Sequence, residues 1–207
     1  MRESDPPESR PYHHGDLRRA LVEAACRLLE REGAAALSLR GVAREAGVSP
    51  AAPYHHFKDK SELLEAVAHE GWEKLAVAFQ AAREAHTSAR ERVRELGVAY
   101  VGFANRHPDL YRVMYDCSRD KADMPAHLHE DENSAYGRVK NVLISAGADP
   151  TDEIGLELAT IACWCAAHGL AEMTSFKQFD PLKEALGGEE AFLRGVLAHV
   201  AVFAKGL

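Results

Sequence analysis

The sequence contains no run of apolar residues that approaches the ~20 needed for a membrane-spanning helix. Its first ten residues, Met1 to Arg10, are polar and contain proline, so they do not resemble a secretory signal peptide. β-Branched residues are sparse beside Ala, Leu, Glu and Arg, which favour helices. We therefore expect a globular, cytoplasmic protein of the all-α class.

Paired cysteines and common catalytic motifs are also absent. The four cysteines, Cys26, Cys117, Cys163 and Cys165, form no Cys-x-x-Cys pair and lie in segments with helical periodicity, so we expect buried, reduced thiols. There is no Gly-x-Ser-x-Gly, no His-Glu-x-x-His and no glycine-rich phosphate loop after a strand. These absences argue against an enzyme, and no cofactor is implied.

Charge is divided unevenly along the chain, whose net charge is −7 at pH 7. Residues 1–60 carry 10 Lys and Arg against 9 Asp and Glu, whereas the remaining residues carry 15 against 23. The first part also contains four histidines. A near-neutral segment joined to an acidic one is typical of a small DNA-binding domain on a body with another role.

The apolar spacing before residue 60 predicts three helices, at about 16–33, 38–47 and 49–57. Asp16 is the expected N-cap of the first helix and Ser38 that of the second, while Asp59 or Ser61 is expected to open the helix after residue 57. Ser49-Pro50 opens the third, and Pro53 is expected to be tolerated within its first turn. Two short helices joined by a tight glycine-containing turn predict a helix-turn-helix. Further helices are predicted at about 59–85, 88–106, 108–116, 132–147, 151–175 and 189–205, about nine in total.

Three segments of the first third resemble the TetR family of transcription regulators: YHHGDL, SLRGVAREAGVS and AAPYHHFKDKSELL. The resemblance is specific because the helix-turn-helix occurs together with a Tyr-x-His-Phe-x-x-Lys run. It implies a disordered tail at 1–11, a helix-turn-helix DNA-binding domain at 12–60, and a ligand-binding and dimerisation domain at 61–207.

In such proteins the third helix lies in the major groove of DNA. The resemblance implies a set of DNA-binding residues at or near this helix: Arg40, Ser49, Pro50, Ala51, Ala52, Tyr54, His55, His56 and Lys60. Because positions 50–52 are apolar, we expect specificity to depend on thymine methyl groups, on Arg40 and on DNA shape. The alternative is that Tyr54 and Phe57 are simply core aromatics and that the histidines lie on a solvated face. For Phe57 we expect this alternative to hold, so that it is a core residue.

The segment CWCAAHGLAEM resembles a TetR subgroup with a Trp-His-Gly (WHG-type) C-terminal domain, through Trp164, His168 and Gly169. The family implies a homodimer formed by the helices at about 151–175 and 189–205, which both carry apolar stripes. It also implies a pocket for a small-molecule effector. The candidates for its lining are Phe103, Tyr111, Met114, Tyr115, Trp164 and His168, with ordinary core packing as the alternative.

We therefore expect a DNA-binding transcription regulator, a repressor that a small molecule releases from a pseudo-palindromic operator in double-stranded DNA. The alternative is a helical adaptor that has lost DNA binding, against which the cation at 40 and the polar side chains of 54–60 argue. His127 and His129 lie in a segment with several acidic residues. We expect a hydrated surface loop there, with no metal.

Overall fold

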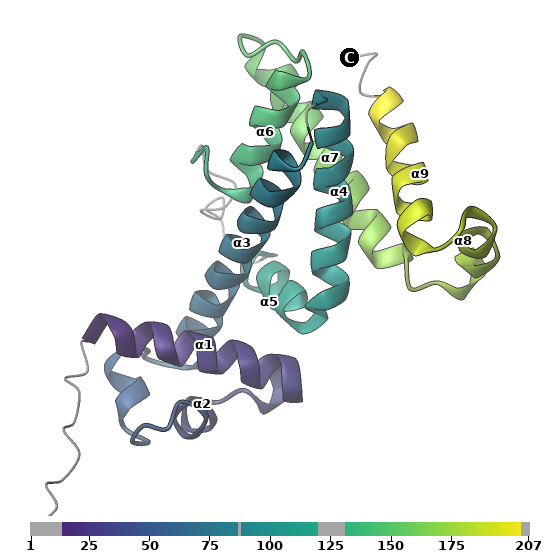
Figure 1. The fold of residues 1–207 in the computed structure, drawn as a ribbon. Coiled ribbons are helices and arrows are strands. Elements are labelled where there is room, and N and C mark those ends of the chain that lie inside the picture. The colour runs from purple at the N-terminus through teal and green to yellow at the C-terminus, as the bar shows by residue number, and fades with distance from the viewer. Residues whose placement is uncertain (1–13, 87, 120–130, 204–207) are drawn as a thin grey trace, which may run out of the picture. The chain divides into compact units, whose positions relative to one another are not determined.

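The computed structural model describes residues 14–86, 88–119 and 131–203, and the regular secondary structure in these residues is entirely helical, which confirms the predicted fold class (Figure 1). The predicted tail at 1–11 and the segment with His127 and His129 lie outside the described residues. The chain divides into two compact units, residues 1–67 and 68–207, whose boundary falls inside α3 (Lys60–Glu84).

The first unit contains α1 (His14–Glu32), η1 (Ala34–Ala36), α2 (Leu39–Glu45), the 3-10 helix η2 (Ala52–His55) and the start of α3. α1 begins before Asp16, which therefore lies in its first turn rather than at the N-cap. The core of the first unit contains fully buried side chains that include Leu21, Leu28, Leu37, Val42 and Phe57.

Two helix starts in this unit follow the predicted capping. The Ser38 hydroxyl accepts a hydrogen bond from the Gly41 backbone N–H at 3.1 Å, as expected for the N-cap of α2. At the start of α3, the Asp59 carboxylate accepts from the Glu62 N–H at 3.0 Å. The Glu62 carboxylate in turn accepts from the Lys58 N–H at 2.8 Å, so both side chains satisfy exposed backbone donors.

The third helix differs from the prediction, because it is a short 3-10 helix instead of an α-helix through Phe57. Pro53 explains the difference. In an α-helix capped by Ser49, the first hydrogen bond would run from the N–H of residue 53 to the Ser49 carbonyl, and proline has no N–H. That carbonyl instead accepts from the Ala52 N–H at 3.0 Å, which is the 3-10 pattern.

In the second unit, α4 (Ala89–Arg106) is the central helix. It contacts α5 (Pro108–Arg119), α6 (Ala135–Ser145), α7 (Glu153–Met173) and α9 (Glu189–Phe203) (Figure 1). Gly97 on α4 makes the approach of α9 possible, because a Cβ there would lie 2.8 Å from a methyl group of Leu197. The second half of α3 completes the unit.

One predicted connection is a helix. Residues 180–188 were expected to separate two helices, but they contain α8 (Asp180–Leu186), which follows the 3-10 turn η4 (Lys177–Phe179). Pro181 lies in the first turn, where its missing N–H costs no hydrogen bond. Gly187 ends the helix with a left-handed φ of 92°. The expectation was wrong because proline and glycine mark the ends of this helix rather than a break.

A buried carboxylate joins α4 to α9. Arg194 donates to both oxygens of Glu95, from Nε at 3.0 Å and from Nη2 at 3.1 Å, and Arg94 Nε donates to the same carboxylate at 3.1 Å. Burial by itself would raise the pKa of Glu95, but the hydrogen bonds from the two guanidiniums outweigh it and hold the pKa below its usual range.

We predict that Arg194→Ala lowers the free energy of unfolding by about 3 kcal/mol, the low end for a broken buried pair, because Arg94 still contacts Glu95. Urea unfolding at fixed protein concentration measures it. The matched control is Arg112→Ala, which removes an exposed pair with Asp109 and should cost less than about 1 kcal/mol.

The contribution of this pair should depend on pH. Because the folded pKa of Glu95 is lowered, the stabilisation is complete above the unfolded carboxyl pKa and is lost as the pH falls through the folded pKa. The difference between wild type and Arg194→Ala should therefore shrink in acid. An equal loss at Arg112, or a pH-independent difference, would contradict the role given to the buried pair.

Candidate nucleic-acid interface and ligand cavity

All the proposed DNA-binding residues except Arg40 lie in the segment 49–60, in which two side chains are buried. Pro53 and Phe57 are buried, and the Arg18 guanidinium lies 5.1 Å from the centre of the Phe57 ring. The core position expected for Phe57 is confirmed. The predicted DNA-binding side chains that are exposed are Arg40, Ser49, Pro50, Ala51, Tyr54, His55 and Lys60, while Ala52 and His56 are half-buried.

Several cations of the first unit are neutralised by a neighbouring carboxylate. Glu45 on α2 pairs with Arg31 at 2.8 Å and with Arg27 at 3.3 Å, both on α1. The hydrogen bond from Arg31 is the main reason that the pKa of Glu45 is lowered. Lys60 Nζ donates to the Ala34 carbonyl at 3.0 Å, so a phosphate contact would have to share this ammonium.

Five exposed cations among the described residues of this unit have no acidic partner, but the Arg18 guanidinium lies over the Phe57 ring and Lys60 donates to a backbone carbonyl. The side chains of the other three, Arg40, Arg44 and Lys58, have neither kind of contact in the described part of the chain. Arg40 was predicted, whereas Arg44 and Lys58 were missed. Their signal was present, because Arg44 follows Arg40 by four residues on α2 and therefore lies on the same helix face. Unpaired cations on α2, which contacts η2, and after η2 are suited, with the exposed Tyr54 of η2, to contact a polyanion.

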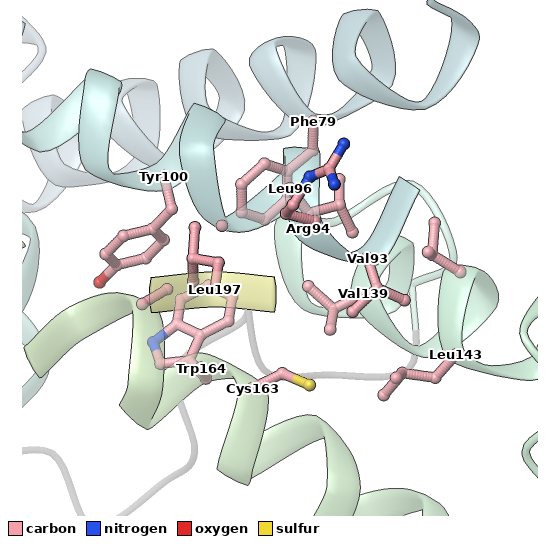
Figure 2. Close-up of a pocket in the computed structure, with 13 residues that line it drawn as sticks. Phe79, Val93, Arg94, Leu96, Tyr100, Val139, Leu143, Cys163, Trp164 and Leu197 are labelled. Carbon is pink, nitrogen blue, oxygen red and sulfur yellow. The ribbon is translucent and has the colours of Figure 1, made fainter. Parts of the chain in front are cut away.

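The second unit contains a cavity with about 550 Å³ of empty space, part of which is open to solvent (Figure 2). α3 and α4 contribute Phe79, Val93, Arg94, Leu96, Gly97 and Tyr100. α6, α7 and α9 contribute Val139, Val142, Leu143, Cys163, Trp164, Ala167 and Leu197.

Of the six predicted lining residues, the structure places Trp164 in the wall of this cavity and the other five outside its lining. Phe103 is buried beside the His107 ring, with the ring centres 5.1 Å apart. Met114 is fully buried against Gly71, where a Cβ would lie 2.6 Å from its sulfur. The spacing of apolar residues in the sequence identified the buried face of α5. It could not show which of the buried residues border an empty space.

Tyr111, Tyr115 and His168 instead form a hydrogen-bonded cluster behind the cavity wall. Tyr100 is the centre of the cluster, with its hydroxyl 3.0 Å from His168 Nδ1 and 3.4 Å from the Tyr111 hydroxyl, and also bonded to the Tyr115 hydroxyl. Tyr111 lies 2.5 Å from His168 Nδ1. Trp164 Nε1 donates to the Tyr115 hydroxyl at 2.9 Å.

The phenols in this cluster stay protonated. Burial raises the pKa of Tyr100 and of Tyr111, and it raises the pKa of Tyr115 to about 12. Because each phenol has one proton to donate, a single chain of donors satisfies the cluster: Trp164 to Tyr115, Tyr115 to Tyr100, Tyr100 to Tyr111, and Tyr111 to His168. The cluster is thus internally satisfied and fixes α4, α5 and α7 together.

A helix-turn-helix unit with unpaired surface cations, joined to a helical unit with an apolar cavity, defines the class of helix-turn-helix regulators. Comparison with known families gives the particular assignment. Residues 21–67 match the model described as bacterial regulatory proteins, tetR family, and residues 93–199 match the model described as a tetracyclin repressor-like C-terminal domain. The chain belongs to the tetR family of DNA-binding transcription regulators, which excludes the enzyme alternative.

Individual relatives agree with this assignment. The HTH-type transcriptional regulator BetI of Rhizobium meliloti (strain 1021) is 42% identical over 79 residues, which are 38% of this chain and 39% of BetI. The match therefore spans about two fifths of that curated relative. A protein of unknown function from Rhodococcus sp. RHA1 superposes with a TM-score of 0.72 at 33% identity, over 96% of this chain and 99% of that one.

A TetR family transcription regulator from Marinobacter aquaeolei VT8 shares the fold, with a TM-score of 0.60 over 92% of this chain and 95% of that chain. Its sequence identity is 20%, so the likeness concerns the fold alone.

The free cations of the first unit generate a prediction about base and phosphate contacts. Arg40→Ala should reduce discrimination at one base pair by about 1–3 kcal/mol, whereas Lys58→Ala should weaken all sequences alike and lower the salt slope by about 1. Fluorescence anisotropy with an operator selected from randomised duplexes, and with single-base variants of it, measures both effects.

The matched control is Arg31→Ala, because Glu45 already neutralises this guanidinium. It should leave affinity and the salt slope close to the wild-type values. If Arg40→Ala weakens every sequence equally, Arg40 contacts the backbone and does not read bases.

Proposed function

We propose that the chain is a homodimeric repressor that binds a pseudo-palindromic operator and is released when a small molecule fills the cavity of the second unit. The observation that carries the proposal is the exposed, unpaired cations of two adjoining elements: Arg40 and Arg44 lie on α2, which contacts η2, and Lys58 follows η2 in the chain. An adaptor that had lost DNA binding would have no need for cations without acidic partners.

α3 offers a route for the response to a ligand. It begins with Lys60 in the first unit, and further along it contributes Phe79 to the wall of the cavity. A ligand that binds more tightly to one of two positions of this helix shifts the population toward that position. A coupling of ~1–3 kcal/mol would change operator affinity by about 5–150-fold.

The proposed dimer is supported by an uncovered apolar stripe on α7. Ile154, Leu158 and Ile161 are 76%, 59% and 43% exposed, and Cys165 continues the stripe with an exposed thiol. Their spacing of four, three and four residues places them on one helix face. α7 is also long and apolar enough to cross a membrane, by length and composition only. We propose instead that a second copy covers it, in a cytoplasmic protein that must reach DNA.

α9 contributes less to the proposed interface than its sequence suggests. Phe192 and Leu197, two members of its predicted stripe, are buried within the protomer. We also retain the WHG subgroup as a proposal, supported by Trp164 and His168 in one hydrogen-bonded cluster. At Gly169, the third residue of the Trp-His-Gly resemblance, nothing among the described residues of the protomer lies within 4 Å of an added Cβ.

The regulator proposal predicts tight binding to DNA from immediately upstream of its own reading frame. Because several phosphates are contacted, the affinity should fall steeply from low to moderate salt, and it should resist shuffled competitor DNA. Fluorescence anisotropy at several salt concentrations measures this. If neither this DNA nor a randomised duplex library yields a bound site, the adaptor function replaces the repressor.

A second prediction concerns the stripe on α7. Leu158→Asp places a charge in the proposed interface and should weaken the dimer at least about 30-fold, which corresponds to about 2 kcal/mol. Sedimentation velocity across a concentration series measures the change. The matched control is Val77→Asp on α3, where the wild-type side chain is 67% exposed but lies outside the stripe. A Leu158→Asp protein that remains as dimeric as Val77→Asp would rule out the α7 interface.

A further inference from the structure

The polar atoms of the aromatic residues in the cavity wall are already used by the protein. Trp164 Nε1 donates to Tyr115 at 2.9 Å, and the Tyr100 hydroxyl belongs to the cluster around His168. Figure 2 shows the indole nitrogen and the Tyr100 hydroxyl on the side of the view opposite Val139 and Leu143. The two aromatic residues therefore present ring carbon to a ligand. Most of the other lining residues present aliphatic carbon.

Arg94 is the exception in this apolar wall. Its side chain is 30% exposed and belongs to the lining of the cavity. Only Nε is engaged, through the 3.1 Å hydrogen bond to Glu95, and the two terminal nitrogens have no acceptor in the described part of the chain. Both oxygens of Glu95 also accept from one edge of Arg194, which Nε and Nη2 form, at 3.0 and 3.1 Å.

The edge formed by the two terminal nitrogens of Arg94 is therefore available to an anion. This edge matches the two oxygens of a carboxylate, which a guanidinium binds through two parallel N–H···O bonds. Glu95 keeps the guanidinium in position without occupying that edge. A site with carbon walls and one fixed cation selects a ligand with an apolar body and a single negative charge.

We propose that the effector is an amphiphilic organic monocarboxylate, with its hydrocarbon part in the cavity and its carboxylate on the terminal edge of Arg94. The proposal deepens the proposed function and rests on it for the regulatory consequence. The binding chemistry itself depends only on the cavity and Arg94. A neutral alcohol of the same shape fills the same walls but gains no charged pair.

The test compares acids with matched alcohols on the full chain at pH 7, by isothermal titration calorimetry. The probes are octanoate against 1-octanol, and 4-phenylbutyrate against 4-phenylbutan-1-ol, so that a linear and an aromatic body are both examined. The wild type should bind at least one acid about 10- to 100-fold more tightly than its alcohol, the range expected for hydrogen bonds to a charged group.

Arg94→Gln should abolish this preference by weakening the acid while the affinity for the alcohol is unchanged. Arg94→Lys, which keeps the charge but not the planar edge, should retain part of the preference. The matched control is Arg90→Gln, an exposed arginine one turn earlier on α4 that does not line the cavity. It should behave as the wild type, and retained alcohol binding by Arg94→Gln shows that the cavity is intact.

The proposal is overturned if acids and alcohols bind equally, if Arg94→Gln keeps the preference, or if neither acid binds at millimolar concentration. Operator binding, measured separately with and without acid, distinguishes this failure from that of the proposed function. An acid that binds through Arg94 but leaves DNA affinity unchanged supports the ligand class and overturns the regulatory role. DNA binding without any preference for acids overturns the ligand class alone.

Discussion

The second unit depends on the buried carboxylate of Glu95, because a buried negative charge needs a positive charge close to it. Two guanidiniums surround it, one from its own helix α4 and one from α9, so the crossing of these helices is tied to a charge that cannot be left unpaired. Gly97, one half-turn along α4, lets Leu197 of α9 approach closely. The same crossing thereby sets one wall of the cavity, and it also orients Arg94 at that wall.

The aromatic cluster solves a different problem on the other side of α4. The phenols of the buried Tyr100 and Tyr111 and of the half-buried Tyr115, with an indole and an imidazole, would each be costly without partners, and together they satisfy one another. Because their polar atoms face each other, the rings of Tyr100 and Trp164 can border the cavity as apolar surfaces. Because the cluster uses these polar atoms for its own hydrogen bonds, they are not offered to a ligand in the cavity. Arg94 is then the lining group that can select a charged ligand.

Local patterns predicted the helices well, because capping and apolar spacing act over a few residues. Ser38 and Asp59 begin helices as expected, and Phe57 is a core residue. The cavity could not be predicted in the same way. Tyr111 and Met114 lie on the buried face of α5, but whether a buried side chain meets an empty space depends on neighbours that are far away in sequence. Arg94 was missed because only the contact with α9 shows how its terminal edge is left free.

Pro53 shows how one missing donor shapes the segment assigned to DNA recognition. Without an N–H at this position the α-helical pattern cannot start from Ser49, and a 3-10 turn forms instead. The ring of Pro53 is then buried together with Phe57, which turns Ala51, Tyr54 and His55 toward solvent. Since alanines offer bases only methyl groups, a short element of this kind reads DNA mainly through shape and through the cations that flank it. We therefore propose that direct readout of bases falls to α2, where Arg40 and Arg44 share one exposed face.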